Sequence, residues 1–234
     1  MLAYRPASYA LFLHYPRIKI ATVMSRSPAR LEVRDLVVER GEFKLETAIS
    51  FTASAHALIH LKGANGSGKT TALRAMAGLV TPTAGTLVWH GISIENNPVY
   101  LAALNYVGHL NGLSAELSAL ENLEFMSRIS CQAQIRSAAE ALALVRASAF
   151  AERPVRQLSA GQRRRAALAR LALFDCPLWM LDEPFTALDA ESRILLENLI
   201  DAHLDDGGIA IVATHQAFGC RHPATQMTLG GPAG

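Results

Sequence analysis

The sequence predicts an α/β fold in which helices flank a parallel sheet, and three observations carry this prediction. Short apolar runs that suit strands buried on both faces occur at residues 178–181 and 209–213. A further strand is predicted at residues 57–62, and a glycine-rich turn joins it to a helix predicted at residues 69–77. Strands that alternate with helices in this way are typical of α/β sheets.

The composition is that of one globular domain. The 234 residues are 50% hydrophobic and carry a formal net charge of +2, which gives no reason to propose nucleic-acid binding. No apolar run reaches the roughly 18 residues of a membrane span, so we expect other subunits to form any path across a membrane. Cys131, Cys176 and Cys220 lie far apart in the sequence, which predicts free thiols in a reducing compartment.

The first 30 residues are predicted to be an N-terminal extension. Residues 1–23 contain basic side chains but no acid, and a short apolar stretch runs through residues 9–13. A signal peptide and a basic membrane-surface anchor are two interpretations, but His14, Tyr15 and Pro16 interrupt the apolar stretch. We favour a third interpretation, an upstream start codon with the true chain beginning at Met24, which the intact mass of natively expressed protein would decide.

An antiparallel β segment is predicted at the start of the domain. Residues 31–38 mix apolar and charged positions, which indicates a half-exposed strand, and a second strand is predicted at residues 43–51. Two more strands are predicted after the first helix, at residues 86–94 and 104–107.

Residues 110–160 are predicted to form a helical insert. Ser118 with Glu121 and Ser137 with Glu140 fit the capping-box pattern, in which a serine and an acid three residues later cap a helix start. A third such pair, Ser159 with Gln162, opens the next helix. The expected domain organisation is therefore an extension at 1–30, a domain at 31–220 and a C-terminal tail at 221–234.

A phosphate-binding loop is predicted at Gly63-Ala-Asn-Gly-Ser-Gly-Lys-Thr70, which matches the pattern G-x-x-x-x-G-K-[ST] in full. Glycines let several backbone N–H groups and a helix N-terminus point at one anion. Lys69 adds a full charge near the β and γ phosphates, and the Thr70 hydroxyl suits Mg²⁺, which takes oxygen ligands. The nucleotide-binding residues predicted here are Gly63, Ala64, Asn65, Gly66, Ser67, Gly68, Lys69, Thr70 and Thr71.

Two adjacent acids are predicted at the carboxyl edge of the sheet, where open α/β sheets bind ligands. Asp182 and Glu183 directly follow the apolar run at residues 178–181. Neighbouring strand residues point to opposite faces, so we expect different tasks for the two. Asp182 would hold Mg²⁺, and Glu183 would orient or deprotonate the attacking water.

Further motifs resemble those of ABC ATPases. Leu158-Ser-Ala-Gly-Gln162 is similar to the LSGGQ signature of the family, with Ala160 in place of the first glycine. Residues 187–189 resemble the D-loop, which contributes Asp189, and His215 resembles the switch histidine. The resemblance covers residues 31 to about 218 and implies a P-loop NTPase of the ABC type, an ATPase whose catalytic residues are Glu183, His215 and Lys69. In that family Ser159, Gly161 and Gln162 meet the γ-phosphate bound to a second copy.

Some positions depart from the family pattern. His109 stands where the family usually has a glutamine, and it can still bind water, Mg²⁺ or a membrane partner. Arg40 takes the place of the usual base-stacking aromatic, with Phe43 nearby, so these two residues are the candidates for adenine stacking. The arginines of the helix after the signature, among them Arg164, are predicted to form a solvated face rather than an anion site.

The departures themselves resemble one subfamily, the ATP-binding subunits of bacterial cytochrome c maturation systems, known as haem exporters. The segments that carry this resemblance include residues 106–109, 120–123, 157–164, 182–189 and 207–216. It implies ATP and Mg²⁺ as ligands, a homodimer, and a peripheral position of this chain on the cytoplasmic face of the inner membrane, where it joins integral-membrane subunits. Turnover would drive haem export or release a haem-loaded chaperone. No residue pattern here indicates haem binding to this chain itself.

Three other interpretations stay open from the residues. One is an ABC ATPase that serves another solute, which neighbouring cytochrome c assembly genes would argue against. Another is a soluble ABC protein of translation or DNA repair, although those usually carry tandem cassettes or long coiled coils, and co-purification with membranes would discriminate. The third is a nucleotide-binding module without turnover, which the presence of both Glu183 and His215 disfavours.

Overall fold

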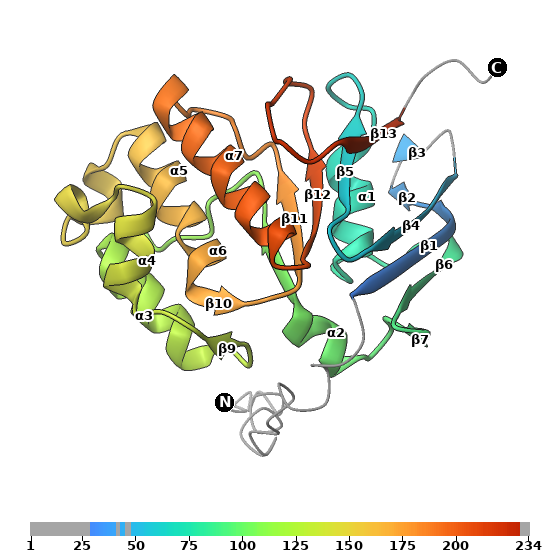
Figure 1. Ribbon diagram of the computed structural model, residues 1–234, viewed down its shortest axis with the longest axis horizontal. Helices are drawn as coiled ribbons and strands as arrows, with labels where there is room; N and C mark the ends of the chain where they lie inside the picture. Colours follow the sequence, from blue (N-terminus) through green and yellow to red (C-terminus); the bar gives the residue numbers. More distant parts are fainter. Residues whose placement is uncertain (1–28, 41–42, 45–47, 230–234) are drawn as a thin grey trace, which may run out of the picture.

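The fold is built on two sheets that lie side by side, with a helical region beyond the larger one (Figure 1). The computed structural model describes residues 29–40, 43–44 and 48–229, so most of the predicted extension lies outside the described residues. The side chains of Arg40 and Phe43, the candidates for adenine stacking, also lie outside them. Within the described ranges, no helix is both long and apolar enough to cross a membrane.

The larger sheet is parallel and has five strands. In spatial order these strands are β13 (Ala224–Thr228), β5 (Leu58–Lys62), β12 (Ile209–Ala213), β11 (Leu178–Asp182) and β8 (Leu104–Val107). Every position of β11 and β12 is buried, which explains their continuous apolar runs. Because parallel strands end at one edge, the segments that follow β5, β11 and β12 meet there.

The predicted boundary between domain and tail at residue 220 is wrong. β13 pairs with β5 from Ala224 opposite Leu58 to Thr228 opposite Lys62, so the chain after 220 supplies a strand of the central sheet. Leu229, directly after β13, is 3% exposed. This segment therefore completes one side of the sheet beside the phosphate loop.

The smaller sheet is antiparallel, as the sequence predicted, but two of its strands differ from the prediction. Its order is β4 (Ile49–Ser54), β1 (Arg30–Val37), β6 (Ala84–Trp89) and β7 (Ile92–Ser93). The strand predicted at 86–94 is a hairpin, because His90 and Gly91 take φ values of 50° and 82°, which a two-residue hairpin turn requires. The strand predicted at 43–51 is present as β3 (Phe43–Lys44), which pairs with β2 (Glu39–Arg40), and the separate β4.

Helices cover the sheets and form the predicted insert. All three predicted capping boxes are present, and both hydrogen bonds of each box form. Helix α1 (Lys69–Met76) directly follows the phosphate loop, and helix α2 (Pro98–Ala103) directly precedes β8. The helical region contains α3 (Ala119–Ile129), α4 (Ala138–Leu144), 3₁₀ turns at Ser148–Phe150 and Val155–Gln157, α5 (Ala160–Leu168) and α6 (Arg170–Leu173), with the short strands β9 (Ala133–Gln134) and β10 (Phe174–Asp175).

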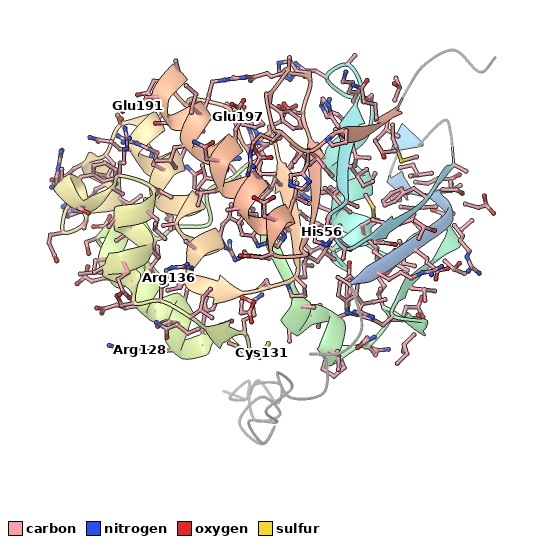
Figure 2. The ribbon with its side chains drawn as sticks, in the orientation of Figure 1. His56, Arg128, Cys131, Arg136, Glu191 and Glu197 are labelled. Carbon is pink, nitrogen blue, oxygen red and sulfur yellow. The ribbon has the colours of Figure 1, made fainter. Side chains whose placement is uncertain are left out.

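The long helix α7 (Ala190–Asp205) holds the chain that follows β12. Its residues Arg193, Glu197, Asp201 and Asp205 recur every four positions, so they share one face of the helix (Glu197 is labelled in Figure 2). Arg193 donates to the backbone oxygen of residue 217 at 2.7 Å, and Glu197 accepts from the backbone N–H of residue 219 at 2.8 Å. Asp201 accepts from the backbone N–H of residue 221 at 2.9 and 3.0 Å, and Asp205 accepts from the Arg221 guanidinium at 2.7 Å. We call these four side chains the α7 ladder.

Candidate functional site

The phosphate loop joins β5 to α1 and is shaped for an anion. Gly63 lies so close to its neighbours that a Cβ there would stand 2.3 Å from Ser67 Oγ and 2.6 Å from the Leu229 carbonyl oxygen. Gly68 is the N-cap of α1 with a φ of 92°, and no side chain caps this helix start. The positive helix end therefore opens into the loop, as at other phosphate-binding helix termini.

Lys69 crosses back over this loop. Its side chain is 6% exposed, and Nζ donates to the carbonyl oxygens of Gly63 at 2.8 Å and Ala64 at 2.9 Å. Nζ also lies 3.9 Å from Glu183 Oε1. The ammonium group is thus held between the loop that would carry phosphate and the second predicted acid.

Asp182 ends β11 inside the protein and faces Thr70. Its side chain is fully buried, and Oδ1 accepts from the Thr70 hydroxyl at 2.9 Å. Oδ2 is buried and has no hydrogen-bond partner among the described residues. Burial raises the pKa of Asp182, while the Thr70 hydrogen bond and the nearby His109 oppose that rise. A carboxylate oxygen without a hydrogen-bond partner, next to a hydroxyl group, offers the oxygen ligands that Mg²⁺ prefers.

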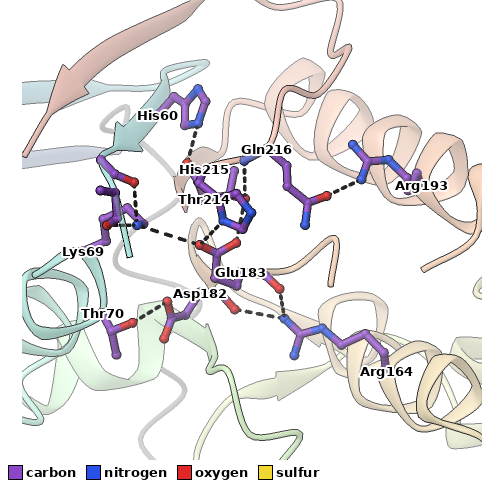
Figure 3. Close-up of polar contacts among 12 residues, drawn as sticks. His60, Lys69, Thr70, Arg164, Asp182, Glu183, Arg193, Thr214, His215 and Gln216 are labelled. Atoms are coloured by element: carbon purple, nitrogen blue, oxygen red, sulfur yellow. Dashed lines mark hydrogen bonds and ion pairs between the residues drawn. The ribbon is translucent and has the colours of Figure 1, made fainter. Parts of the chain in front are cut away.

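Glu183 turns toward the end of β12 (Figure 3). Its backbone takes a φ of 44°, a left-handed conformation that is uncommon outside glycine and often found at functional sites. Oε2 accepts from the Thr214 hydroxyl at 2.8 Å, and Oε1 lies 3.1 Å from His215 Nδ1. Burial alone would raise the pKa of Glu183, but the hydrogen bonds from His215 and Thr214 and the charge of Lys69 lower it below its usual value.

Lys69, Glu183 and His215, the predicted catalytic residues, therefore lie together, with Thr70 and Asp182 beside them (Figure 3). Thr214 is a member of this cluster that the sequence analysis did not single out. Its only signal is its position between a buried strand and the histidine. His60 in β5 supports the same segment, because its Nε2 lies 3.1 Å from the Thr214 carbonyl oxygen.

The remaining predicted site residues lie apart from this cluster. Ser159 caps α5 and is exposed, and no hydrogen bond or ion pair among the described residues joins 159–162 to the phosphate loop. Gly161 packs against the residues before α7, since a Cβ there would stand 2.8 Å from the Ala187 carbonyl oxygen. Asp189 caps α7 by accepting from the Ser192 N–H at 2.8 Å. His109 is exposed and close enough to Asp182 to affect its pKa.

The prediction of a solvated arginine face on α5 is wrong for Arg164. This residue is 3% exposed, and its guanidinium lies behind the acid pair rather than in solvent. Arg163 and Arg165, on either side, are partly exposed. Each residue turns about 100° around a helix axis, so three consecutive arginines cannot share one environment.

Comparisons with known proteins point to one family. A family model described as ABC transporter matches residues 47–186. The cytochrome c biogenesis ATP-binding export protein CcmA of Escherichia coli O157:H7 is 45% identical over 80% of this chain and 89% of its own length. The protein of the same name from Methylococcus capsulatus is 42% identical over 87% of this chain and 99% of its own length.

Among solved structures, a dimeric post-hydrolysis state of the ATP-binding cassette MJ0796 bound to ADP and Pi superposes with a TM-score of 0.68. It is 25% identical and covers 80% of this chain and 88% of its own length. The family match spans more than half of the chain, and the relatives above 40% identity span four fifths of it or more. The chain belongs to the ABC transporter family, among relatives of the cytochrome c biogenesis ATP-binding export proteins.

Proposed function

We propose that this chain is the ATP-hydrolysing subunit of an export complex in cytochrome c maturation. The observation that carries the proposal is identity above 40%, over four fifths of the chain or more, to proteins named for that role. The cargo would be haem, or a haem-loaded chaperone that ATP turnover releases, as the subfamily resemblance implies. Integral-membrane subunits would form the path, and this chain would join them from the cytoplasmic face of the inner membrane.

The cluster supports hydrolysis rather than binding alone. Lys69 Nζ can exchange its loop carbonyl partners for phosphate oxygens, because it already lies at the mouth of the loop. Glu183 is held as a carboxylate by Thr214 and His215, so it can accept a hydrogen bond from the attacking water. His215 is placed to stabilise charge on the phosphoryl group as it leaves.

Thr70 and Asp182 would hold Mg²⁺ with the nucleotide. The metal, when bound, would neutralise charge on the β and γ phosphates. The protein's part is to keep the Thr70 hydroxyl and the unpaired Asp182 Oδ2 on one side of the phosphate loop. The Glu183 carboxylate points toward Thr214 and His215 instead, so it would not bind the metal and would remain available to accept a hydrogen bond from water.

We further propose that two copies complete each ATP site. Within one chain no hydrogen bond or ion pair of the described residues joins the predicted signature residues 159–162 to the phosphate loop, and Ser159 caps the positive N-terminus of α5, which attracts anions. A second copy packed head to tail would bring its residues 159–162 to the γ-phosphate. The dimeric relative with ADP and Pi supports this arrangement for the fold.

Replacing Asp182 with Asn should stabilise the ligand-free protein and abolish the gain in stability from Mg²⁺ and ATP. Burial raises the pKa of Asp182, so the folded state loses stability as pH rises from the unfolded value of 3.8 through the raised folded value. Asn keeps the acceptor for Thr70 without the charge. We expect a gain of about 1 kcal/mol, or a Tm rise of about 2–4 °C.

Thermal melts with and without Mg²⁺ and ATP measure both effects. Asp175→Asn, at an exposed position, is the matched control and should melt like wild type under both conditions. Two results would contradict the assignment of Asp182 as a buried ligand for Mg²⁺. One is an Asp182→Asn protein with a lower Tm than wild type in the absence of ligand, and the other is an Asp182→Asn protein whose Tm rises as much as that of wild type when Mg²⁺ and ATP are added.

Complementation tests the cellular function. The chain is expressed in a bacterium that lacks its own cytochrome c biogenesis ATP-binding export protein, and c-type cytochromes are stained for covalent haem. We expect staining to return with wild type and with Lys62→Ala, but not with Lys69→Ala. Membrane-bound protein that hydrolyses ATP without restoring staining would favour another solute, and protein absent from the membrane fraction would favour a soluble ABC protein.

A further inference from the structure

Arg164 is the most completely bonded buried cation of the described residues. It sits in the second turn of α5 and is 3% exposed. A guanidinium has five N–H donors, and all five are used here. The acceptors, with their distances, are Pro184 O at 3.2 Å, Gly108 O at 2.9 Å, Asn111 Oδ1 at 3.2 Å, Asp182 O at 3.0 Å and Glu183 O at 2.9 Å.

These five bonds join three parts of the site. Three of them bind the backbone of residues 182–184. Figure 3 shows the two that reach the backbone oxygens of Asp182 and Glu183. Two more bind the chain on either side of His109, through Gly108 and Asn111. The side chain itself belongs to the helix that begins at Ser159, so one group fixes the acid pair, the His109 segment and the signature helix to each other.

The chemistry of this contact requires arginine. Burial lowers the pKa of Arg164, and the carboxylates of Asp182 and Glu183 oppose that change, so the group stays a cation. A lysine offers three donors around one atom and cannot reach five acceptors arranged around a planar fork. Most of the acceptors are backbone oxygens. The guanidinium therefore fixes the position of the backbone and does not pair directly with a carboxylate.

We propose that Arg164 is a positioning residue for ATP hydrolysis, which holds Asp182, Glu183 and the His109 segment in register with the signature helix. No hydrogen bond or ion pair of the described residues links Arg164 to the phosphate loop or Lys69, so its loss should act on the chemical step and spare nucleotide affinity. This inference rests on the proposed ATP hydrolysis.

The test compares Arg164→Lys and Arg164→Ala with Arg165→Gln, a matched control on the next, partly exposed arginine of the same helix. ATP turnover, ATP affinity and the number of ATP sites per chain are measured with the purified chain and with vesicles from the complemented strain. We expect kcat to fall about 100-fold in both Arg164 variants, as a displacement of about 1 Å of catalytic groups would cause. The ATP Kd should stay within about threefold of wild type, a difference below 1 kcal/mol.

Chemical rescue separates positioning from mere stabilisation. Methylguanidinium, added to Arg164→Ala well below unfolding concentrations, should restore part of kcat because it can refill the vacated fork. A turnover of Arg164→Lys equal to that of Arg165→Gln would overturn the inference, and so would a loss explained entirely by fewer ATP sites per chain. Wild type without turnover in either preparation would instead contradict the proposed function, and this inference with it.

Discussion

Glu183→Gln should lower ATP turnover by a factor on the order of 10² to 10⁴, the usual contribution of a positioned general base, and leave ATP binding intact. Glutamine keeps the size of the side chain and one acceptor oxygen for Thr214, but it carries no charge and cannot take a proton from water. The Glu183 carboxylate contacts Lys69, Thr214 and His215, and no hydrogen bond of the described residues ties it to the glycines of the loop. The variant should therefore keep its ATP affinity while its ATP turnover falls.

The same variant tests the proposed dimer. If ATP is clamped between two copies, slow hydrolysis should make the dimer accumulate, which size-exclusion chromatography or analytical ultracentrifugation with ATP and Mg²⁺ would detect. Glu152→Gln, at an exposed position of the helical insert, is the matched control and should turn over ATP like wild type. A Glu183→Gln protein that binds ATP yet stays monomeric would argue against a shared site.

Lys69→Ala should weaken ATP binding by about 10- to 100-fold, because a charge-assisted hydrogen bond contributes about 1.5–3 kcal/mol. Turnover should fall further than affinity, since the same ammonium would also meet charge that develops as the γ-phosphate leaves. Because Lys69 is buried, the charge that it would supply to the phosphates is screened less by water than a surface charge would be. Equilibrium binding of a fluorescent ATP analogue and phosphate release measure the two effects.

Lys62 supplies the matched control for Lys69. It lies at the end of β5, seven residues earlier, and its Nζ donates to Gln226 Oε1 at 2.9 Å on the surface. Lys62→Ala removes an equal charge from the same region and should leave ATP affinity and turnover unchanged. If both lysine variants lose affinity alike, the effect belongs to overall charge, and the phosphate-loop assignment of Lys69 fails.

Much of this site could be predicted because its determinants are local. The glycines and Lys69 form one uninterrupted segment, and the acid pair directly follows a run of apolar residues. The capping boxes need only a serine and an acid or amide three positions apart. Since parallel strands end at one edge, the meeting of these segments follows from strand order rather than from any long-range detail.

The missed features depend on contacts that local sequence does not encode. β13 has no buried position and no apolar alternation, and it pairs with β5 more than 160 residues away in the chain. The hairpin of β6 and β7 looked continuous because Trp89 and Ile92 extend the apolar pattern across its turn. Arg164 is one of three consecutive arginines, and only the packing of α5 against the end of β11 decides which of them faces inward.

The α7 ladder connects the chain that follows His215 to the length of α7. The ladder binds the chain at residues 217–221, shortly after His215, and the N-cap of α7 is Asp189, which lies in the segment that a second copy would approach in the proposed dimer. A helix of 16 residues is about 24 Å long at 1.5 Å per residue and bends little. Because four side chains along α7 bind residues 217–221, we expect a displacement of the first turn of the helix to displace that chain with it.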